Sequence, residues 1–236
     1  MEQWKEDDFH VLSKKLSEKQ FFDYFSLKAA EIGFEFCSFG IALPLPVNNP
    51  KFIVHNNFPA KWWESYQIKN YLSIDPTVRH GLFSLAPILW NEKTFTAEPA
   101  MWEDAQLHGI KYGWAQAAWD ARGTKGMISL SRSAQDVDEA ELDMSISRMQ
   151  HLAQMLLVGM TDLILPKEFP ESQSRLTLRE KEVMRWTADG KTSYEIGLIL
   201  IISASTVNFH INNVIEKLNA VNKIQAVMKA ALLGLL

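Results

Sequence analysis

The last quarter of the chain carries a close series of helix-start signals, and these limit its fold more than any other feature of the sequence. Residues suited to capping a helix N-terminus occur at Thr177, Thr192, Ser203 and Asn222. The first two have Glu three residues later, which makes each of them a capping box. Gly190 stands where the first helix must end, and a tight turn over residues 201–204 joins the second helix to the third. Four short helices with such a turn predict an all-α unit that contains a helix-turn-helix.

The third of these helices has two contrasting faces. Its apolar residues recur every three or four positions and predict the face that packs on the core: Val207, Ile211, Val214 and Leu218. The other side carries short hydrogen-bonding side chains: Ser205, Thr206, Asn208, His210, Asn212 and Asn213. Several of these residue types lower helix propensity, but they can reach phosphates and base edges in a major groove. They therefore indicate a DNA-reading helix, with an ordinary polar surface helix as the alternative.

The charge of the chain is unevenly distributed. Residues 175–236 hold eight Lys and Arg against five Asp and Glu, a balance of +3, whereas residues 1–174 have a balance of −7. Nucleic-acid binding confined to the last quarter is expected to give this distribution. A charge of +3 is small, and many domains that bind no nucleic acid carry as much.

The first part of the chain mixes short apolar stretches with separated helix signals. Stretches of strand type cover residues 37–43, 52–54, 88–90, 113–119 and 126–133, and the last two flank a turn over residues 121–125. Helices are expected from Ser17 to Gly33, over 59–69, after the Asp75 and Pro76 pair, and over 101–108. This pattern predicts an α+β unit with an antiparallel sheet.

A single long helix is predicted over residues 138–165. Its apolar residues form a heptad seam: Leu142, Ile146, Met149, Ala153, Leu156, Met160 and Leu163. The seam packs either on the sheet of its own chain or, in part, on a second copy of the chain. Pro166 is expected to end this helix, and the polar residues 166–174 form the predicted linker.

Several classes of protein are disfavoured by composition. No apolar run reaches the roughly 18 residues needed to span a bilayer, so no membrane association is expected. The polar, acidic residues 1–8 lack the pattern of a secretion signal. The lone Cys37 cannot form an internal disulfide, which makes the cytoplasm the expected compartment. Six of the eight tryptophans lie between Trp62 and Trp119, which indicates either an aromatic core or a pocket for a largely apolar small molecule.

Two groups of motifs resemble one family. Residues 176–192, with the later segment from Ser205 to His210 and the Lys217-Leu218 and Asn222-Lys223 pairs, resemble the DNA-binding domain of LuxR-type regulators. In the first half, a set of residues matches the autoinducer-binding domain of acyl-homoserine-lactone receptors in order and spacing: Trp62, Tyr66, Asp75, Pro76, Trp90 and Gly113. The resemblance implies an N-terminal α/β/α sandwich over residues 1–165, a linker over 166–174 and a helix-turn-helix domain over 175–236. It identifies the chain as a quorum-sensing transcription factor of the LuxR family.

The resemblance also implies roles for individual residues toward an N-acyl-homoserine lactone. Trp62 would donate to the lactone carbonyl, Asp75 would accept from the amide N–H, and Tyr66 with Ser129 would donate to the amide carbonyl. Trp90 would lie beside the ring, Gly113 would let the backbone come close, and Ser38 would lie at the rim. The acyl tail would meet apolar walls at Phe52, Phe58, Val78, Leu82, Ile110, Trp114 and Met127. As alternatives, Asp75 is only a helix cap, Trp62 and Tyr66 are plain core residues, and Ser129 is an ordinary strand serine.

DNA recognition is expected to need two copies of the chain, since one helix makes few contacts. The seam of the long helix offers one dimer surface, and the last helix offers another through Ile224, Val227, Met228, Ala231, Leu232 and Leu235. A two-fold homodimer should bind an inverted repeat in double-stranded DNA. Arg179, Lys191 and Lys217 are predicted to hold phosphates, while Thr206, Asn208, His210 and Asn212 face bases or the nearby backbone. RNA polymerase is a further partner if the chain is an activator.

Other functions fit the sequence less well. Nucleophile-elbow, zinc-protease, Walker and dinucleotide-binding motifs are lacking, so an enzyme is not expected, nor is a cofactor or metal. A phosphorylated receiver domain is disfavoured because the strand and helix signals do not alternate regularly. A solo LuxR-type regulator that answers a different small apolar signal remains the alternative.

Overall fold

A computed structural model of the chain describes residues 8–236, which form two compact units. Most of residues 8–163 form the first unit, and residues 164–236 belong to the second. The first unit contains a five-stranded antiparallel sheet in the order β2-β1-β5-β4-β3. Its strands are β1 (Phe36–Ala42), β2 (Phe52–Asn56), β3 (Ile88–Trp90), β4 (Tyr112–Trp119) and β5 (Lys125–Arg132).

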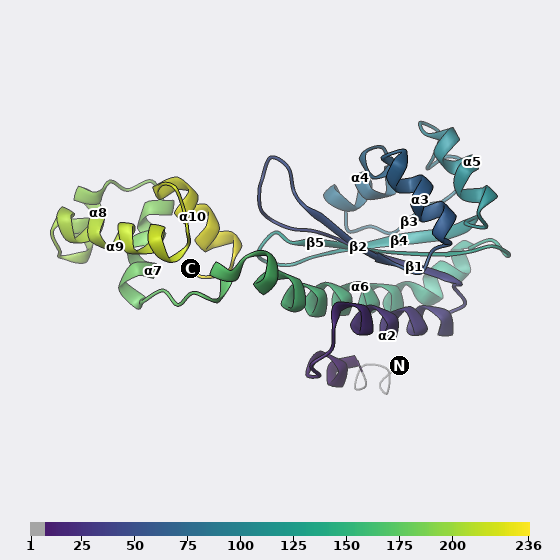
Figure 1. Cartoon of the computed structure of the whole chain (residues 1–236), viewed down its shortest axis with the longest axis horizontal. Helices are drawn as coiled ribbons and strands as arrows, with labels where there is room; N and C mark the ends of the chain where they lie inside the picture. Colours follow the sequence, from purple (N-terminus) through teal and green to yellow (C-terminus); the bar gives the residue numbers. More distant parts are fainter. Residues whose placement is uncertain (1–7) are drawn as a thin grey trace. The chain divides into compact units, whose positions relative to one another are not determined.

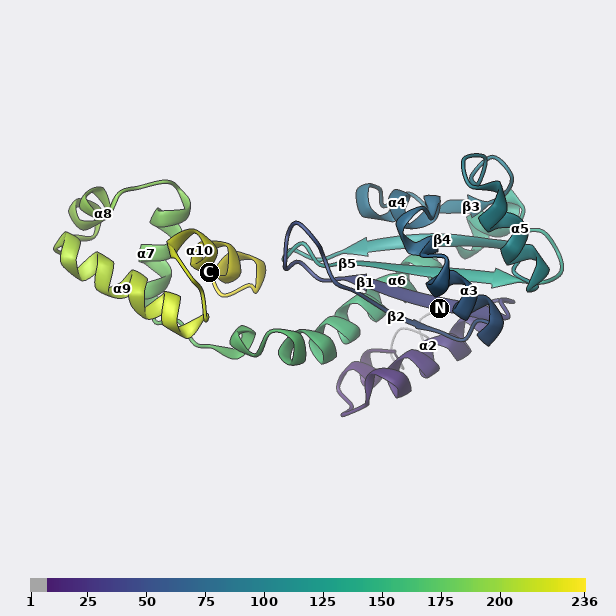
Figure 2. The same ribbon diagram turned by 45° about the horizontal axis from the view of Figure 1, so that its top comes forward.

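Helices cover both faces of this sheet (Figures 1 and 2). The helices α2 (Glu18–Glu31) and α6 (Glu139–Glu168) lie on one face. The other face carries α3 (Ala60–Ile68), the 3-10 turn η1 (Tyr71–Ser73), α4 (Pro76–Phe83) and α5 (Pro99–Leu107). The predicted α+β class and the α/β/α layering are therefore confirmed.

The long helix α6 packs within its own chain. Met149, Leu156 and Met160 of the predicted seam are fully buried, and the ring of Phe21 from α2 lies so close to Gly159 that a Cβ there would be 2.0 Å from the ring. The central part of the seam therefore packs within its own chain, which is one of the two arrangements expected from the sequence. It is not available for contact with a second copy. Close packing of α2 on α6 is what fills this side of the sheet.

Pro166 does not end α6, which continues to Glu168. The missing N–H of a proline would leave the carbonyl four residues earlier without its helical partner. That carbonyl belongs to Asp162, an exposed residue, so water can take the place of the lost donor. The predicted linker over residues 166–174 is accordingly part helix and part 3-10 turn, with η2 at Pro170–Gln173.

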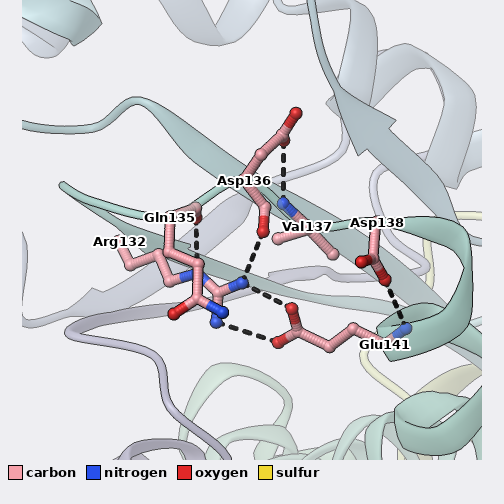
Figure 3. A network of polar contacts seen from close by, with 6 residues as sticks. All are labelled: Arg132, Gln135, Asp136, Val137, Asp138 and Glu141. Carbon is pink, nitrogen blue, oxygen red and sulfur yellow. Dashed lines mark hydrogen bonds and ion pairs between the residues drawn. The ribbon is translucent and has the colours of Figure 1, made fainter.

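A buried arginine secures the entry to α6 (Figure 3). Arg132, at the end of β5, donates from its guanidinium to Glu141 and to the backbone carbonyls of Gln135 and Asp136. Asp138 caps the first turn of α6 by accepting from the backbone N–H of Glu141 at 2.7 Å. These contacts fix the direction in which the chain leaves the sheet.

The second unit consists of four helices around one core. They are α7 (Leu178–Ala188), α8 (Ser193–Leu200), α9 (Ala204–Lys217) and α10 (Lys223–Leu232). The predicted N-caps are all present, and Thr177 and Thr192 form complete capping boxes. The α8–α9 pair is the helix-turn-helix. The predicted core face of α9 is buried, at Val207, Ile211, Val214 and Leu218.

No single helix within residues 8–236 is long and apolar enough to cross a membrane. The pair α8 and α9 reaches that length and apolarity only when taken together, across a bend of 107°.

Candidate ligand pocket and DNA-binding helix

A cavity of about 90 Å³ lies in the first unit, bounded by the sheet and by residues of α3, α4 and α5. One water molecule needs roughly 10–15 Å³, so the cavity has room for a small organic molecule and not only for a single water molecule. All the predicted ligand-binding residues except Gly113 and Trp114 line it: Ser38, Phe52, Phe58, Trp62, Tyr66, Asp75, Val78, Leu82, Trp90, Ile110, Met127 and Ser129. The aromatic-rich segment of the sequence therefore surrounds a pocket as well as a core.

Asp75 is both a helix cap and a cavity residue. One of its carboxylate oxygens accepts from the backbone N–H of Thr77 at 2.8 Å and from the Thr77 hydroxyl at 2.7 Å, at the start of α4. The other oxygen accepts from the Tyr66 hydroxyl at 3.0 Å. Burial raises the pKa of Asp75, and the hydrogen bonds from Thr77 and Tyr66 partly oppose this. The capping role predicted as an alternative is thus real, but it uses only one of the two oxygens.

Tyr66 gives its single O–H to Asp75 and not to the open cavity. Burial raises the pKa of Tyr66, and the neighbouring Asp75 carboxylate raises it further, so the phenol keeps its proton. Its ring packs edge-on against Trp62, with centroids 5.6 Å apart. A ligand carbonyl that took this O–H would have to replace Asp75 as the acceptor.

Several further donors of cavity-lining residues have no protein partner within residues 8–236, among them the indole N–H groups of Trp90 and Trp102. Ser38 and Ser129 face each other across β1 and β5, and both are largely buried. Neither hydroxyl, nor the indole N–H of Trp62, forms a hydrogen bond with any of residues 8–236. Buried polar groups are normally paired, so these donors indicate a site built for a polar group of a ligand.

Two of the predicted pocket residues lie elsewhere. Side chains alternate along a strand, and Trp114 of β4 therefore points away from the cavity face and is fully buried in the core. Gly113 does not line the cavity. A Cβ at this glycine would lie 2.4 Å from the Leu130 carbonyl oxygen and 3.0 Å from the Trp90 ring, so its place is needed for strand packing and for the position of Trp90.

Other lining residues were not singled out in the sequence. Trp63, Leu72, Thr77, Phe95, Met101, Trp102, Ala105 and Lys125 also line the cavity. Alternation in β5 could have revealed Lys125, because it lies four residues before Ser129 on the same face. No comparable periodic signal marks the aromatic residues contributed by loops and α5.

An acidic residue of α5 holds the helical cover of the pocket together. Asp104 accepts hydrogen bonds from Ser65 at 2.7 Å, Lys69 at 2.8 Å and Tyr71 at 3.1 Å, which join α3, η1 and α5. The hydrogen bond from Lys69 lowers the pKa of Asp104 against the opposing effect of burial. The ring centroids of Tyr71 and Trp62 lie 5.7 Å apart, so this cluster helps to hold the Trp62 indole in position.

In the second unit, the polar face of α9 is accessible. Asn208 and Asn212 are exposed, and Thr206 and His210 are half-buried. The side-chain carbonyl of Asn208 accepts from Ser193 of α8 at 2.6 Å, which leaves the amide NH₂ as its free donor. The geometry is compatible with reading acceptors on base edges or phosphates.

The three predicted phosphate contacts differ in their surroundings. Lys191 follows the end of α7 and is half-buried. Arg179 pairs with Glu182 at 2.8 Å and reaches the Leu200 carbonyl. Lys217 donates to the nearly buried carboxylate of Glu180 at 2.7 Å and 2.9 Å, so it ties the end of α9 to α7. This structural role was not foreseen for Lys217.

Comparison with known proteins follows the same division of the chain. Residues 17–157 match the autoinducer binding domain family, and residues 174–230 match the bacterial regulatory proteins of the luxR family. The chain belongs to the LuxR family. It is 41% identical to the transcriptional activator protein SolR of Ralstonia nicotianae over 98% of both chains. It is 39% identical to the transcriptional activator protein AnoR of Acinetobacter nosocomialis over the whole of both chains.

A solved LuxR-family structure has the same fold. SdiA in complex with octanoyl-rac-glycerol is similar with a TM-score of 0.80 and 31% identity, covering 98% of this chain and 94% of that chain. The family consists of quorum-sensing transcriptional regulators with an autoinducer-binding and a DNA-binding domain, and this LuxR-family chain has both. Within residues 8–236, no group of three or more His, Cys, Asp or Glu is placed to hold a metal ion.

Proposed function

We propose that this LuxR-family regulator binds an N-acyl-homoserine lactone in the pocket of its first unit and, as a homodimer, binds an inverted repeat in DNA to regulate transcription. The protein would act in the cytoplasm, where the chromosome is, and would catalyse no reaction. The observation that carries the proposal is the polar group of Trp62, Tyr66, Asp75 and Ser129 in a cavity whose other walls are mostly apolar.

The head of an acyl-homoserine lactone offers two carbonyl acceptors and one amide donor, and the polar group complements all three. The indole N–H of Trp62 suits the lactone carbonyl, and the hydroxyl of Ser129 suits the amide carbonyl. The amide N–H would donate to the Asp75 oxygen that now accepts from Tyr66. Tyr66 would then be free to donate to the amide carbonyl, so the exchange of partners leaves both Tyr66 and Asp75 paired.

The acyl chain would lie against the apolar walls between α4 and the sheet, at Phe52, Val78, Leu82 and Met127. Each methylene that leaves water contributes about 0.8 kcal/mol. Binding should therefore tighten with chain length until the cavity is full, which favours medium to long chains.

The second unit offers a surface through which two copies of the chain would pair on DNA. The last helix α10 exposes Ile224 by 71% and Met228 by 38%, four residues apart on one side. Pairing of this side with its copy would bury apolar surface and place two α9 helices about a two-fold axis. Two such helices require an inverted repeat with half-sites about one helical turn apart. Because SolR and AnoR are named transcriptional activators, we extend this role, with a contact to RNA polymerase, to this chain.

A second ligand class has one specific observation in its favour. The related SdiA has been solved with octanoyl-rac-glycerol, an acyl ester without a lactone ring or amide. Such a molecule would use the donors Trp62 and Ser129 and the apolar walls, and a glycerol hydroxyl, in place of the amide N–H, would have to donate to Asp75.

Thermal unfolding of the full chain with matched ligands separates these two classes. A buried ligand stabilises only the folded state, by about 2.7 kcal/mol at a hundred times its Kd. Octanoyl-homoserine lactone should raise the melting temperature at lower concentration than octanoylglycerol does. Equal melting curves with and without the lactone, or stronger stabilisation by octanoylglycerol, would contradict the lactone proposal.

A further inference from the structure

A lysine lies among the largely apolar residues that line the part of the cavity where the acyl chain would lie. Lys125, the first residue of β5, lines the same cavity as the polar group at Asp75. It is half-buried, and it has no carboxylate partner within residues 8–236. Apolar or small cavity residues surround this position, among them Ala42, Gly126 and Met127.

The ammonium of Lys125 is held in place by groups that use only part of its donor capacity. It donates to the Leu82 carbonyl at the end of α4. It also lies 4.9 Å from the ring centre of Trp119 and 5.3 Å from that of Phe83. An ammonium has three N–H donors, so after the bond to Leu82 two remain for water or for a ligand.

Two lengths, one along β5 and one along α4, place Lys125 far from the head-group end of the cavity. Along β5 it precedes Ser129 by four residues, which corresponds to about 13 Å of strand. Along α4, Asp75 caps the N-terminus, while Leu82, the acceptor of the lysine, lies seven residues later, which corresponds to about 10 Å of helix. The lining of the cavity therefore runs along α4 from Asp75 at one end to Lys125 at the other, and the lysine ammonium lies at that end beside the rings of Phe83 and Trp119.

A saturated acyl tail that reached this end would displace water from the ammonium without offering an acceptor in return. Removing hydration from a charge is unfavourable unless a hydrogen bond replaces it. We propose that Lys125 is a specificity-determining residue that selects acyl ligands with an acceptor oxygen, such as a hydroxyl, oxo or carboxylate oxygen, on the part of the chain distant from the head group. This inference rests on the proposed function, since it assumes that an acyl chain fills the cavity.

The test compares two lactones of equal length, N-dodecanoyl-homoserine lactone and its analogue hydroxylated at the chain end. Both would be measured by competitive displacement on the full chain, for the wild type, Lys125→Met and Lys125→Arg. The methionine is apolar and of similar length, and the arginine keeps a charged donor. The ratio of the two Kd values within one variant cancels differences in the amount of folded protein.

The wild type should favour the hydroxylated lactone by about tenfold, the size expected for one hydrogen bond to a charged group. Lys125→Met should lose this preference and bind the unmodified lactone at least as well as the wild type does, while Lys125→Arg should keep the preference. A wild-type ratio near one, or an unchanged ratio in Lys125→Met, would overturn the role of Lys125 while leaving lactone binding intact. If the wild type binds neither lactone, the proposed function fails and this inference fails with it. Should Lys125→Met not fold, the ratios of the wild type and Lys125→Arg still decide, because loss of preference in the arginine variant contradicts the proposal.

Discussion

At the scale of single residues, the pocket is organised around the hydrogen bond that the Tyr66 hydroxyl donates to Asp75. Asp75 has one oxygen committed to the start of α4 and the other to Tyr66. The first contact fixes the carboxylate in position, and the second can be exchanged for a ligand. A residue that serves the fold with one atom and the ligand with another cannot be replaced without affecting both.

Asp75→Asn should weaken lactone binding about tenfold or more, because it removes a charged acceptor worth about 1.5–3 kcal/mol. Titration calorimetry on the full chain measures the change. Protonation of Asp75 should have the same effect as the substitution. Since burial raises its pKa, affinity in the wild type should fall with acidification at a pH above the roughly 3.9 of an exposed aspartate. Wild-type affinity in Asp75→Asn would contradict the assignment.

Ser129 and Ser131 provide a matched pair of substitutions on one strand. Both are buried on the same face of β5, but only Ser129 lines the cavity. Ser129→Ala should weaken lactone binding several-fold through the loss of one hydrogen bond of about 1 kcal/mol, while Ser131→Ala leaves it unchanged. Equal effects of the two substitutions in the same calorimetric titration would show that Ser129 acts through strand packing alone.

Among the predicted site residues, those whose spacing carries information line the cavity. Asp75 before Pro76 marks a helix start, and Trp62 with Tyr66 marks one side of a helix. The prediction that Trp114 lines the pocket was wrong, because the identity of an apolar strand residue does not show which face of the sheet it occupies. Asp104 was missed because its partner Lys69 lies 35 residues away in the chain.

At the scale of elements, helix caps explain why the second unit could be predicted almost completely. Each helix there begins at a side chain that accepts from the backbone N–H three residues later, which is a local interaction. The end of α6 could not be predicted in the same way. Whether Pro166 stops a helix depends on how water and neighbouring segments satisfy one carbonyl, and this is a tertiary property.

Glu180 joins a capping box to an ion pair, so it should stabilise the second unit more than other acids of α7 do. It accepts from Thr177 and from Lys217, and these contacts outweigh the effect of burial and lower its pKa. Glu180→Gln should reduce the free energy of unfolding by about 1–3 kcal/mol at neutral pH. The nearby Glu182→Gln is the control, because its pair with Arg179 is exposed and contributes about 0–1 kcal/mol.

The pH dependence of this difference has a definite sign. The lowered pKa of Glu180 means that its stabilisation is present above the roughly 4.3 of an unfolded glutamate and is lost as the pH falls through the folded value. The difference between wild type and Glu180→Gln should therefore shrink below about pH 4, as measured by denaturant unfolding. A constant difference from neutral to acidic pH would show that the charge of Glu180 is not responsible.

At the scale of the whole molecule, binding to an inverted repeat requires two copies of the chain. Ile224→Asp should convert the dimer to a monomer, because it places a charge in the proposed apolar contact of α10. Sedimentation velocity measures the state, and gel shift on an inverted repeat measures the consequence. Leu107→Asp is the control, since Leu107 is 84% exposed on α5 and lies outside the proposed contact. A dimer that persists in Ile224→Asp would place the interface elsewhere.

Base recognition and phosphate contacts by the second unit should respond differently to substitution. Asn208→Ala should change which bases are preferred, because the free amide of Asn208 is a directed donor. Lys191→Ala should instead weaken binding to all sites and reduce the dependence of affinity on salt by about one phosphate contact. Selection from randomised DNA and a salt series measure the two effects. A Lys191→Ala protein with the salt dependence of the wild type would contradict the phosphate contact.

The most direct test of the account is the identity of the small molecule that the protein holds. The full chain and its Asp75→Asn variant can be purified from a culture that produces acyl-homoserine lactones, and the molecules released on denaturation can be identified by mass spectrometry. We expect about one N-acyl-homoserine lactone per wild-type chain and a clearly smaller amount in the variant. Wild-type protein that carries another class of acyl compound in that amount, or folded wild-type protein that carries no lactone at all, would contradict the central claim.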